Sequence, residues 1–402
     1  MADKVLMKGN EAIAEAAIIA GCRHYFGYPI TPQTEIAAYM AKRLPKIGGV
    51  FLQAESEVAA INMVYGVAAT GTRVMTSSSS PGISLKSEGL SYLAGADLPS
   101  LVVNVQRGGP GLGGIQPSQA DYFQATKGGG HGDFHMIVLA PSSVQEMAEL
   151  TVHGFDLADK YRMTSMILAD GTMGQMMEPV ALDQLKVGEA VEKPWATTGT
   201  KLERTHNIVN SLSLVPEELE QLNFDRYDRY KVIEENEVMY ETYRMEDAEI
   251  CIAAFGIASR VSRNAVDAAR EMGIKVGMIR PITLWPFPKK VFKDSLATCK
   301  AYISVELSMG QMIEDVMLAT EGKAPVTLCN RVGGMIPSPE QVLESIKESR
   351  TITSTVSELM LLMEARPKRT ARWSLGIVSG WNFTAEWLTQ GPSTSMPRRV
   401  AS

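Results

Sequence analysis

Short apolar runs alternate with longer, alanine-rich segments along the first 170 residues of the chain. The runs are as apolar as buried strands, and the segments between them repeat apolar residues at helical spacing. The expected strands are 22–26, 49–54, 73–77, 100–106, 136–140 and 163–169, and the expected helices are 10–21, 32–44, 56–70, 83–94 and 143–161. Because the strands are apolar throughout, the pattern predicts an α/β fold with a parallel sheet that helices cover on both faces.

Local sequence signals mark the ends of two of these helices. Segment 10–21 opens with Asn10, a good helix cap, and closes on Gly21. Ser143 and Glu146 have the spacing of a capping box, which predicts the start of the helix that runs to about Tyr161.

A second, shorter series of strands and helices follows a polar interruption. Periodicity fades between about Val187 and Asp247, and this stretch is predicted to be a long connecting excursion. Expected strands then lie at 249–255, 275–280, 301–305 and 326–330, with helices at 258–272, 288–298, 310–319 and 339–348. From about Arg366 the chain is rich in Ser, Pro and Arg, which is typical of a peripheral or poorly ordered tail. The predicted domains are 1–186, the excursion 187–246, a smaller α/β domain 247–350 and the tail 351–402.

Composition narrows the class of protein. A chain of 402 residues with 45% hydrophobic and 21% charged residues is typical of a globular enzyme with two cores. The net charge of −6 gives no basic field for nucleic acid, and no apolar run reaches the ~20 residues that span a membrane. The N-terminus does not resemble a signal peptide, so we expect a cytoplasmic protein.

The four cysteines lie far apart, and none forms a Cys-x-x-Cys pair. This spacing predicts no metal centre on thiolates in this chain. Most of them sit in apolar, strand-like segments, so buried free thiols in a reducing compartment are the expectation.

A turn framed by two prolines follows the first predicted strand, with the sequence Phe26-Gly27-Tyr28-Pro29-Ile30-Thr31-Pro32. The prolines fix φ at their own positions and favour extended geometry at the residues before them. We expect a rigid turn at the carboxyl end of the strand, where open parallel sheets bind ligands, with the Thr31 hydroxyl facing that edge.

Two charged residues also lie at expected strand ends. Glu57 opens the helix 56–70, where a buried carboxylate is costly unless it meets a partner. It could equally complement the helix dipole, as Glu55 could. Arg107 ends the strand 100–106 and precedes a glycine loop, a suitable position for pairing with a small anionic substrate, although a surface arginine at a loop start fits as well.

Other motifs have plainer interpretations. The glycines at 109, 111 and 114 formally match Gly-x-Gly-x-x-Gly, but the loop does not open a helix, so a substrate-facing loop is favoured over a dinucleotide site. The hydroxyl-rich run 76–80 could bind a phosphate or a polar ring edge, or simply cap a helix. Asp170 before Gly171 is interpreted as a strand-to-loop turn, and His131 and His135 as loop histidines and not metal ligands.

Taken in order, these motifs resemble those of the alpha subunits of the 2-oxoacid:ferredoxin oxidoreductases. The resemblance rests on segments 27–32, 55–60 and 76–82 and on Arg107 with its glycine loop, and it extends over roughly residues 5–350. It is closest to the branched-chain (3-methyl-2-oxobutanoate) type, with the 2-oxoglutarate type next.

The resemblance implies a thiamine diphosphate enzyme divided over several chains. This chain would supply the pyrimidine-binding domain and then a transketolase-C-terminal-like domain. A beta subunit would bind the diphosphate and Mg²⁺, and gamma and delta-type subunits would complete the complex, with iron–sulfur clusters on chains other than this one. A small 2-oxoacid would be decarboxylated to acyl-coenzyme A, with electrons passing to ferredoxin.

The resemblance also implies roles for single residues. Glu57 matches the glutamate that hydrogen-bonds the aminopyrimidine ring of the cofactor, and Thr31 and Arg107 match the residues that bind the 2-oxoacid. Further contacts with the cofactor are expected from Tyr28, Pro29, Ile30 and Ser80, and no residue of this chain is expected to bind a metal. Two alternatives stay open: a non-catalytic subunit that recognises substrate or stabilises the complex, and a self-sufficient decarboxylase or transketolase. The second is disfavoured because no diphosphate or metal half-site is visible in the sequence.

Overall fold

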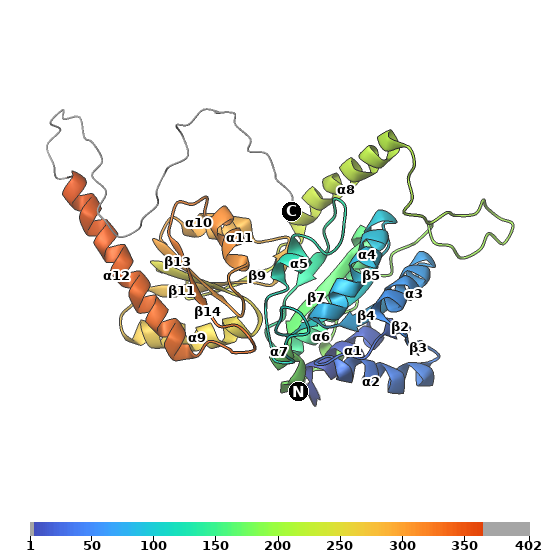
Figure 1. Ribbon diagram of the computed structural model, residues 1–402, viewed down its shortest axis with the longest axis horizontal. Coiled ribbons are helices and arrows are strands. Elements are labelled where there is room, and N and C mark those ends of the chain that lie inside the picture. Colours follow the sequence, from blue (N-terminus) through green and yellow to red (C-terminus); the bar gives the residue numbers. More distant parts are fainter. Residues whose placement is uncertain (1–3, 365–402) are drawn as a thin grey trace, which may run out of the picture. The chain divides into compact units, whose positions relative to one another are not determined.

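The computed structural model describes residues 4–364, and residues up to Val356 group into one compact unit (Figure 1). Its largest element is a seven-stranded sheet with the strand order β12-β6-β7-β5-β4-β2-β3. The strands are β2 (His24–Gly27), β3 (Val50–Gln53), β4 (Val74–Ser78), β5 (Ser100–Gln106), β6 (Ile137–Leu139), β7 (Thr164–Asp170) and β12 (Thr283–Trp285). All neighbours pair in parallel except β12, which runs antiparallel to β6. The predicted parallel sheet is confirmed.

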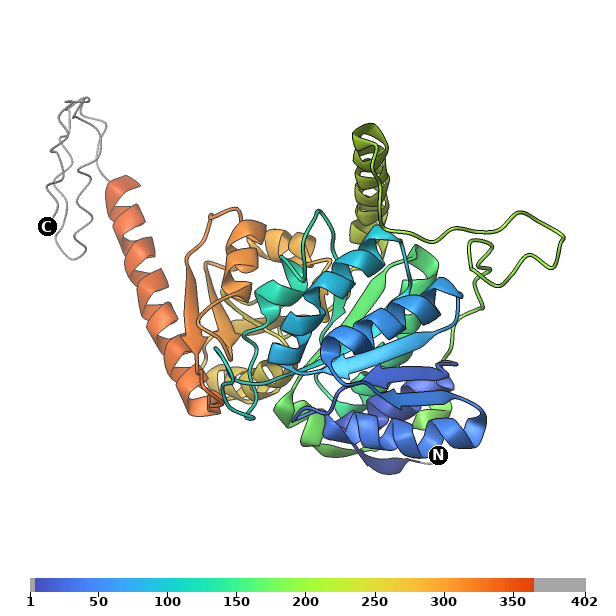
Figure 2. The ribbon, with the colours of Figure 1, turned by 45° about the vertical axis from the view of Figure 1, so that its right-hand side comes forward.

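Helices cover both faces of this sheet, as predicted (Figure 2). The helices α3 (Glu57–Ala69) and α4 (Ser80–Gly95) pack together on one face. The other face carries α1 (Gly9–Ile19), α2 (Thr34–Arg43) and α6 (Val144–Tyr161). Shorter pieces complete this half: α5 (Tyr122–Thr126), α7 (Gly171–Gln175), the 3₁₀ turns η1 (Leu44–Ile47) and η2 (Leu182–Gln184), and a small antiparallel pair of β1 (Val5–Lys8) with β8 (Met177–Val180).

The second series of elements forms a five-stranded sheet with the order β14-β13-β10-β11-β9. Its strands are β9 (Tyr240–Tyr243), β10 (Ile250–Ala254), β11 (Val276–Pro281), β13 (Ala301–Glu306) and β14 (Val326–Asn330), and only β9 is antiparallel to its neighbour. The helices of this half are α9 (Gly256–Glu271), α10 (Lys289–Ser295), α11 (Met312–Ala319) and α12 (Pro339–Glu364). Helix α12 continues past the predicted end at Glu348, and residues 365–402 lie outside the described residues.

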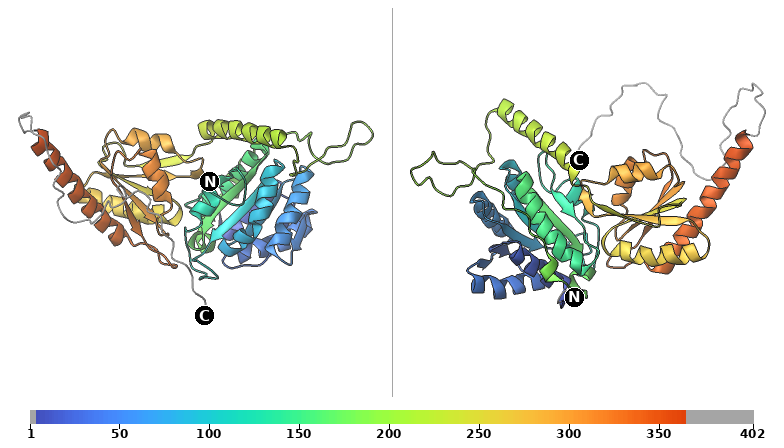
Figure 3. Two further views of the ribbon diagram at one scale, coloured as in Figure 1. Left: turned by 45° about the horizontal axis from the view of Figure 1, so that its top comes forward. Right: turned by 180° about the vertical axis from the view of Figure 1, so that it is seen from behind.

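The segment predicted as a connecting excursion between the two sheets contains the 21-residue helix α8 (Pro216–Asn236), which the sequence analysis did not predict. Only Arg226, Tyr230 and Ile233 of this helix are buried, so it shows little apolar periodicity. Figure 3 shows α8 extending beside the first sheet. The Arg226 guanidinium fixes it there by donating to the Gly95 carbonyl (3.0 Å) and to Asp97 (3.1 Å).

The predicted capping box at the start of α6 is only half present. Ser143 Oγ accepts from the Glu146 N–H (3.1 Å), as a cap should. The Glu146 carboxylate instead accepts from the Ser142 N–H (2.8 Å) and binds Arg280 of β11. This glutamate is therefore drawn away from the capping position by an ion pair with the second sheet.

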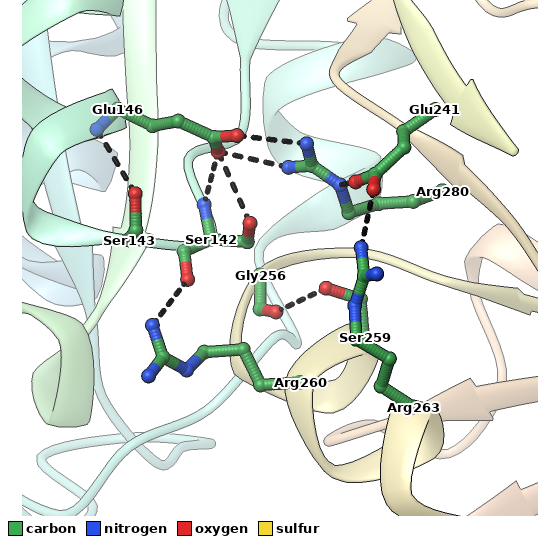
Figure 4. A network of polar contacts seen from close by, with 9 residues as sticks. All are labelled: Ser142, Ser143, Glu146, Glu241, Gly256, Ser259, Arg260, Arg263 and Arg280. Atoms are coloured by element: carbon green, nitrogen blue, oxygen red, sulfur yellow. Dashed lines mark hydrogen bonds and ion pairs between the residues drawn. The ribbon is translucent and has the colours of Figure 1, made fainter. Parts of the chain in front are cut away.

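Arg280 is the centre of the polar network that joins the two sheets (Figure 4). Its two terminal nitrogens donate to both oxygens of Glu146, each at 2.8 Å, and its Nε donates to Glu241 of β9 at 2.8 Å. Around this pair Arg263 of α9 binds Glu241, and Arg260 donates to the Ser142 carbonyl (3.0 Å). The Arg280 side chain is only 4% exposed, so these carboxylates replace the water that would otherwise stabilise its positive charge.

Replacing Arg280 by methionine should lower the free energy of unfolding by about 2–3 kcal/mol, because it removes the charge-assisted hydrogen bonds of a buried guanidinium and leaves the partly exposed carboxylates of Glu146 and Glu241 facing each other without it. The matched change Arg263→Met removes an ion pair whose arginine is 38% exposed, and it should cost about 1 kcal/mol or less. Urea unfolding of both variants measures the difference. Equal losses would contradict the central position of Arg280.

Candidate functional site

The first polar cluster lies where α3 and α4 begin, beside the carboxyl end of β4. Ser56 caps α3 by accepting from the Ala59 N–H (3.1 Å), and Glu57 is the first residue of the helix. Glu57 is only 5% exposed, yet within residues 4–364 its carboxylate has no hydrogen bond or ion pair. A buried carboxylate without a partner on its own chain is an expensive arrangement and therefore suggests a ligand.

Glycine makes room for this carboxylate. A Cβ atom at Gly82 of α4 would lie 2.6 Å from Glu57 Oε1 and 2.1 Å from Ser78 Oγ. One α3 turn further on, a Cβ at Gly89 would lie 2.4 Å from Ile61 Cγ2. The two glycines let α3 and α4 approach closely and bring the Glu57 carboxylate against the end of β4.

The serine run at the end of β4 divides into engaged and unengaged hydroxyls. The Tyr25 hydroxyl lies 2.7 Å from Ser77 Oγ, which donates to Gln33 Oε1 (2.5 Å). By contrast, the buried hydroxyls of Ser78 and Ser79 have no partner among the described residues. The Ser78 hydroxyl borders Gly82 together with the Glu57 carboxylate, and an unengaged hydroxyl at this position again suggests a polar ligand.

A lysine that the sequence analysis did not single out lies behind this cluster. The Lys86 side chain is fully buried, and its Nζ donates to Thr76 Oγ1 (2.8 Å) and to the Ser77 carbonyl (3.0 Å). Burial lowers the pKa of Lys86 from 10.5 to about 7, and the negative charge of Glu57 opposes that shift.

Arg107 and Thr31 lie together, although the strands that precede them, β5 and β2, are separated in the sheet by β4. One terminal nitrogen of Arg107 donates to the Thr31 carbonyl (2.9 Å) and the other to the Leu112 carbonyl of the glycine loop (3.1 Å). The guanidinium is buried and its Nε has no partner among the described residues. Thr31 is exposed, and its side chain, unlike its carbonyl, has no hydrogen bond within that part of the chain.

Ser80 positions Arg107. Its hydroxyl accepts from the Arg107 N–H (3.0 Å) and donates to Asp121 Oδ2 (2.6 Å), while Asn104 also binds Asp121 (2.9 Å). Burial raises the pKa of Asp121, and the hydrogen bonds from Ser80 and Asn104 counteract this. Since the Ser80 hydroxyl is already engaged, Ser78 and Ser79 have the freer hydroxyls for a ligand. The contact predicted for Ser80 stays a prediction.

The proline-framed turn closes the same edge of the sheet. Gln33 joins it to β4, since its Nε2 donates to the Tyr28 carbonyl (3.3 Å) while its Oε1 accepts from Ser77. The side chains of Tyr28 and Pro29 are exposed and that of Ile30 is half-buried, so all three are open to contact from outside the chain. A cavity of about 470 Å³ borders Thr31 and Pro32, and Glu35, Ile115 and Gly171 also line it.

The second sheet supports this edge. After the glycine loop, Gln119 donates to the Phe255 carbonyl (2.9 Å) and accepts from the Leu307 N–H (3.1 Å). Tyr122 of α5 donates to Asp315 of α11 (2.5 Å). The segment that follows Arg107 is therefore fixed by side chains and backbone of the second half.

The remaining motifs have identifiable places in the fold, and a substrate-facing role of the glycine loop stays a prediction. The glycine loop leads into the bridge between Arg107 and Pro117 and opens no helix. Asp170 ends β7 and caps α7 by accepting from the N–H groups of Thr172 (2.9 Å) and Met173 (3.0 Å), and burial raises its pKa to about 6. His135 stacks on Trp285 with ring centroids 4.7 Å apart.

The four cysteines are buried free thiols, as expected. Within residues 4–364, no group of three or more potential metal-ligating side chains is found. In the same part of the chain, no helix combines the length and the apolar character needed to cross a membrane.

Comparison with known families decides the kind of protein. A family model described as "Pyruvate flavodoxin/ferredoxin oxidoreductase, thiamine diP-bdg" matches residues 15–248. The model "Pyruvate:ferredoxin oxidoreductase core domain II" matches residues 248–342. The chain belongs to the 2-oxoacid:ferredoxin oxidoreductase family. The resemblance inferred from the motifs is thus confirmed, and this is an oxidoreductase family.

Two relatives of known name support the same family assignment. The chain is 52% identical over 343 residues to "Ketoisovalerate oxidoreductase subunit VorB" of Methanothermobacter marburgensis, which covers 85% of this chain and 97% of the relative. It is 36% identical over 375 residues to "2-oxoglutarate synthase subunit KorA" of Methanothermobacter thermautotrophicus, which covers 86% of this chain and 99% of the relative.

Solved structures extend the comparison to the fold. A 2-oxoglutarate:ferredoxin oxidoreductase from Magnetococcus marinus, with 2-oxoglutarate, coenzyme A and succinyl-CoA bound, superposes with a TM-score of 0.77 at 29% identity. That match covers 86% of this chain and 65% of the neighbour, so the chain spans about two thirds of the neighbour's length. A split-gene transketolase, described as an inactive beta4 tetramer, matches at a TM-score of 0.54 and 12% identity over 86% of this chain and 99% of its own, which shows a shared fold alone.

Substituting Gly82 by alanine should displace the Glu57 carboxylate and lower the free energy of unfolding by about 1–3 kcal/mol, because the new methyl group overlaps Glu57 Oε1 and Ser78 Oγ. Gly66→Ala in α3 is the matched control, since a Cβ there meets nothing within 4 Å. It should stabilise the helix by about 0.5–1 kcal/mol. Thermal unfolding of the two variants gives opposite signs, and a neutral Gly82→Ala would contradict the close approach of the two helices.

Proposed function

We propose that this chain is the catalytic alpha subunit of a multi-subunit 2-oxoacid:ferredoxin oxidoreductase and that Glu57 binds the aminopyrimidine half of thiamine diphosphate. The observation that carries the proposal is the buried Glu57 carboxylate, which has no partner within residues 4–364 and lies beside two unengaged serine hydroxyls. A heteroaromatic ring edge with both ring nitrogens and an amino group fits such a set of acceptors and donors. The match to a thiamine diphosphate-binding family model over residues 15–248 supports the same assignment.

Thiamine diphosphate, when bound, supplies a stabilised carbanion that allows a 2-oxoacid to lose CO₂. The contribution of this chain is to place a carboxylate in a nearly dry position, where it exchanges a proton with a ring nitrogen through a short, fixed path. The exposed Tyr28 and Pro29 and the half-buried Ile30 would line the ring from the neighbouring turn. Ser80 would hold the backbone of Arg107 beside the ring by accepting from its N–H.

Arg107 and Thr31 would bind the substrate. The buried guanidinium keeps its Nε without a partner in the described part of the chain, which leaves one charge-assisted donor for the substrate carboxylate. The exposed Thr31 hydroxyl lies on the same side, at the cavity that Pro32 and Glu35 also line. Two backbone carbonyls hold the terminal nitrogens of Arg107, which fixes the position of the guanidinium.

The proposal includes a division of labour between subunits. We assign the pyrimidine-binding domain to residues 1–186, the connecting excursion to 187–246 and the transketolase-C-terminal-like domain to 247–350, with 351–402 peripheral; the change of family model at residue 248 supports this assignment. The diphosphate and Mg²⁺ would be bound by a beta subunit, and gamma and delta-type subunits would complete the complex, with iron–sulfur clusters on chains other than this one and electrons passing to ferredoxin. The names of the relatives, which are themselves subunits, support an assembly of this kind, and buried free thiols are typical of the cytoplasm.

We further propose 3-methyl-2-oxobutanoate as the preferred substrate, with 2-oxoglutarate as the second candidate. The identity of 52% to a ketoisovalerate oxidoreductase subunit, against 36% to a 2-oxoglutarate synthase subunit, supports this order. In the purified complex, coenzyme A-dependent dye reduction should be fastest with 3-methyl-2-oxobutanoate when it is compared with 2-oxoglutarate and pyruvate at equal concentration. A preference for 2-oxoglutarate would reverse the order of the two candidates.

Glu57→Gln should lower turnover of the assembled complex by at least ~100-fold, because the amide cannot exchange the proton that the carboxylate exchanges. Glu55→Gln is the matched control, since this exposed glutamate lies two residues earlier and should leave turnover unchanged. The measurement is coenzyme A-dependent dye reduction at saturating 2-oxoacid. Near-normal turnover of Glu57→Gln would favour the alternative of a non-catalytic subunit.

The isolated chain offers a second discrimination. If the diphosphate site is on a partner, this chain alone should not bind thiamine diphosphate tightly in the presence of Mg²⁺. Tight, Mg²⁺-dependent binding in a calorimetric titration would favour a self-sufficient enzyme.

A further inference from the structure

Lys86 is the one fully buried lysine of the described residues, and it lies at the contact between α3 and α4. It follows Gly82 by one helical turn and precedes Gly89 by three residues, so the three share one face of α4. Gly82 meets Glu57 and Gly89 meets Ile61, which are likewise one turn apart on α3. The stem of Lys86 therefore runs between the two points where the helices touch.

The ammonium of Lys86 is anchored behind the carboxylate. Its two hydrogen bonds, to Thr76 Oγ1 and the Ser77 carbonyl, fix it on β4 immediately before the unengaged hydroxyls of Ser78 and Ser79. Three elements face it. Glu57 contributes a negative charge from α3, β4 contributes only neutral hydroxyl and carbonyl groups, and Tyr25 of β2 binds Ser77 with a phenol whose pKa burial raises to about 12.

We propose that Lys86 is a positioning residue for Glu57: its ammonium, fixed on Thr76 and Ser77, is the counter-charge that the buried carboxylate faces across the contact between α3 and α4. The inference rests on the proposed function only for the identity of the ligand that Glu57 would bind. Lys86 and Glu57 form no direct hydrogen bond or ion pair, because the lysine Nζ is bound to Thr76 and Ser77. The attraction acts through a dry interior, where charges interact more strongly than in water.

The coupling can be measured without cofactor or turnover. In the full chain, ¹⁵N-lysine NMR should find that Glu57→Gln lowers the pKa of Lys86 by about one unit or more, because an opposite charge nearby stabilises the ammonium. Glu55→Gln should leave the titration of Lys86 in place. An unchanged Lys86 titration in Glu57→Gln would overturn the proposal, and this experiment keeps Lys86 itself intact.

The reciprocal variant tests the effect on the carboxylate. In the assembled complex, Lys86→Met should move the acidic limb of the pH profile of kcat/KM to higher pH by about one unit, because the carboxylate has lost its counter-charge. Lys42→Met, at an exposed position of α2, should not move that limb. A purely structural role for Lys86 would lower activity equally at all pH values, and that result would also overturn the proposal.

The stability of the chain gives an independent check of the buried lysine. Its folded pKa of about 7 lies below the ordinary value of 10.5, so between these values the unfolded chain binds more protons than the folded chain. The parent should therefore gain stability as the pH rises through this window, and Lys86→Met should lose that gain.

Two outcomes distinguish this inference from the proposed function. If Glu57→Gln abolishes turnover while the Lys86 titration does not respond to it, only the present inference fails. If Glu57→Gln retains turnover, the proposed function fails.

Discussion

The burial of one carboxylate at the first turn of α3 is the constraint around which this edge of the molecule is built. An isolated buried charge is costly, and the fold offsets the cost in several small ways. The N-terminal position of Glu57 places it at the positive end of the α3 dipole. The glycine at position 82 leaves space for it, so that α4 approaches without displacing the carboxylate. None of these features neutralises the charge by direct contact, which is the arrangement expected of a group reserved for a ligand.

The second half of the chain stabilises the site from behind. Strand β12 extends the first sheet beyond β6, and Arg280 binds the first turn of α6. Gln119 is hydrogen-bonded to the backbone of Phe255, just after β10, and of Leu307, just after β13. These two bonds fix the chain between the glycine loop and α5. The loop that leaves the strand at Arg107 is thereby anchored at both ends, so binding of a ligand there would require little further ordering of the chain.

The sequence predicted most of the fold and only part of the site. The apolar runs located nearly every strand of the two sheets because buried parallel strands carry their own pattern. Helix α8 was missed because a helix with three buried residues has almost no periodicity to detect. Strands β9 and β12 were missed because each is short and is defined by its neighbour in the sheet, not by its own residues. At the candidate site, the sequence singled out Glu57, Thr31 and Arg107 because each comes shortly after an expected strand, whereas Lys86 lies inside a helix and its burial depends on which helix packs against it.

The distribution of satisfied and unsatisfied polar groups separates support from function. Ser80, Asn104 and Asp121 are hydrogen-bonded to one another, and the Ser77 hydroxyl is hydrogen-bonded to Tyr25 and Gln33. These bonds give the strand ends a fixed geometry. Three kinds of group nearby are left over: the Glu57 carboxylate, the hydroxyls of Ser78 and Ser79, and the Arg107 Nε. Native proteins leave few buried polar atoms unpaired, so groups of this kind at the carboxyl end of a parallel sheet are candidates for contact with a ligand. This distribution indicates that the polar partners of this edge come from outside the described residues, as they would if the active site were completed by a ligand and a second subunit.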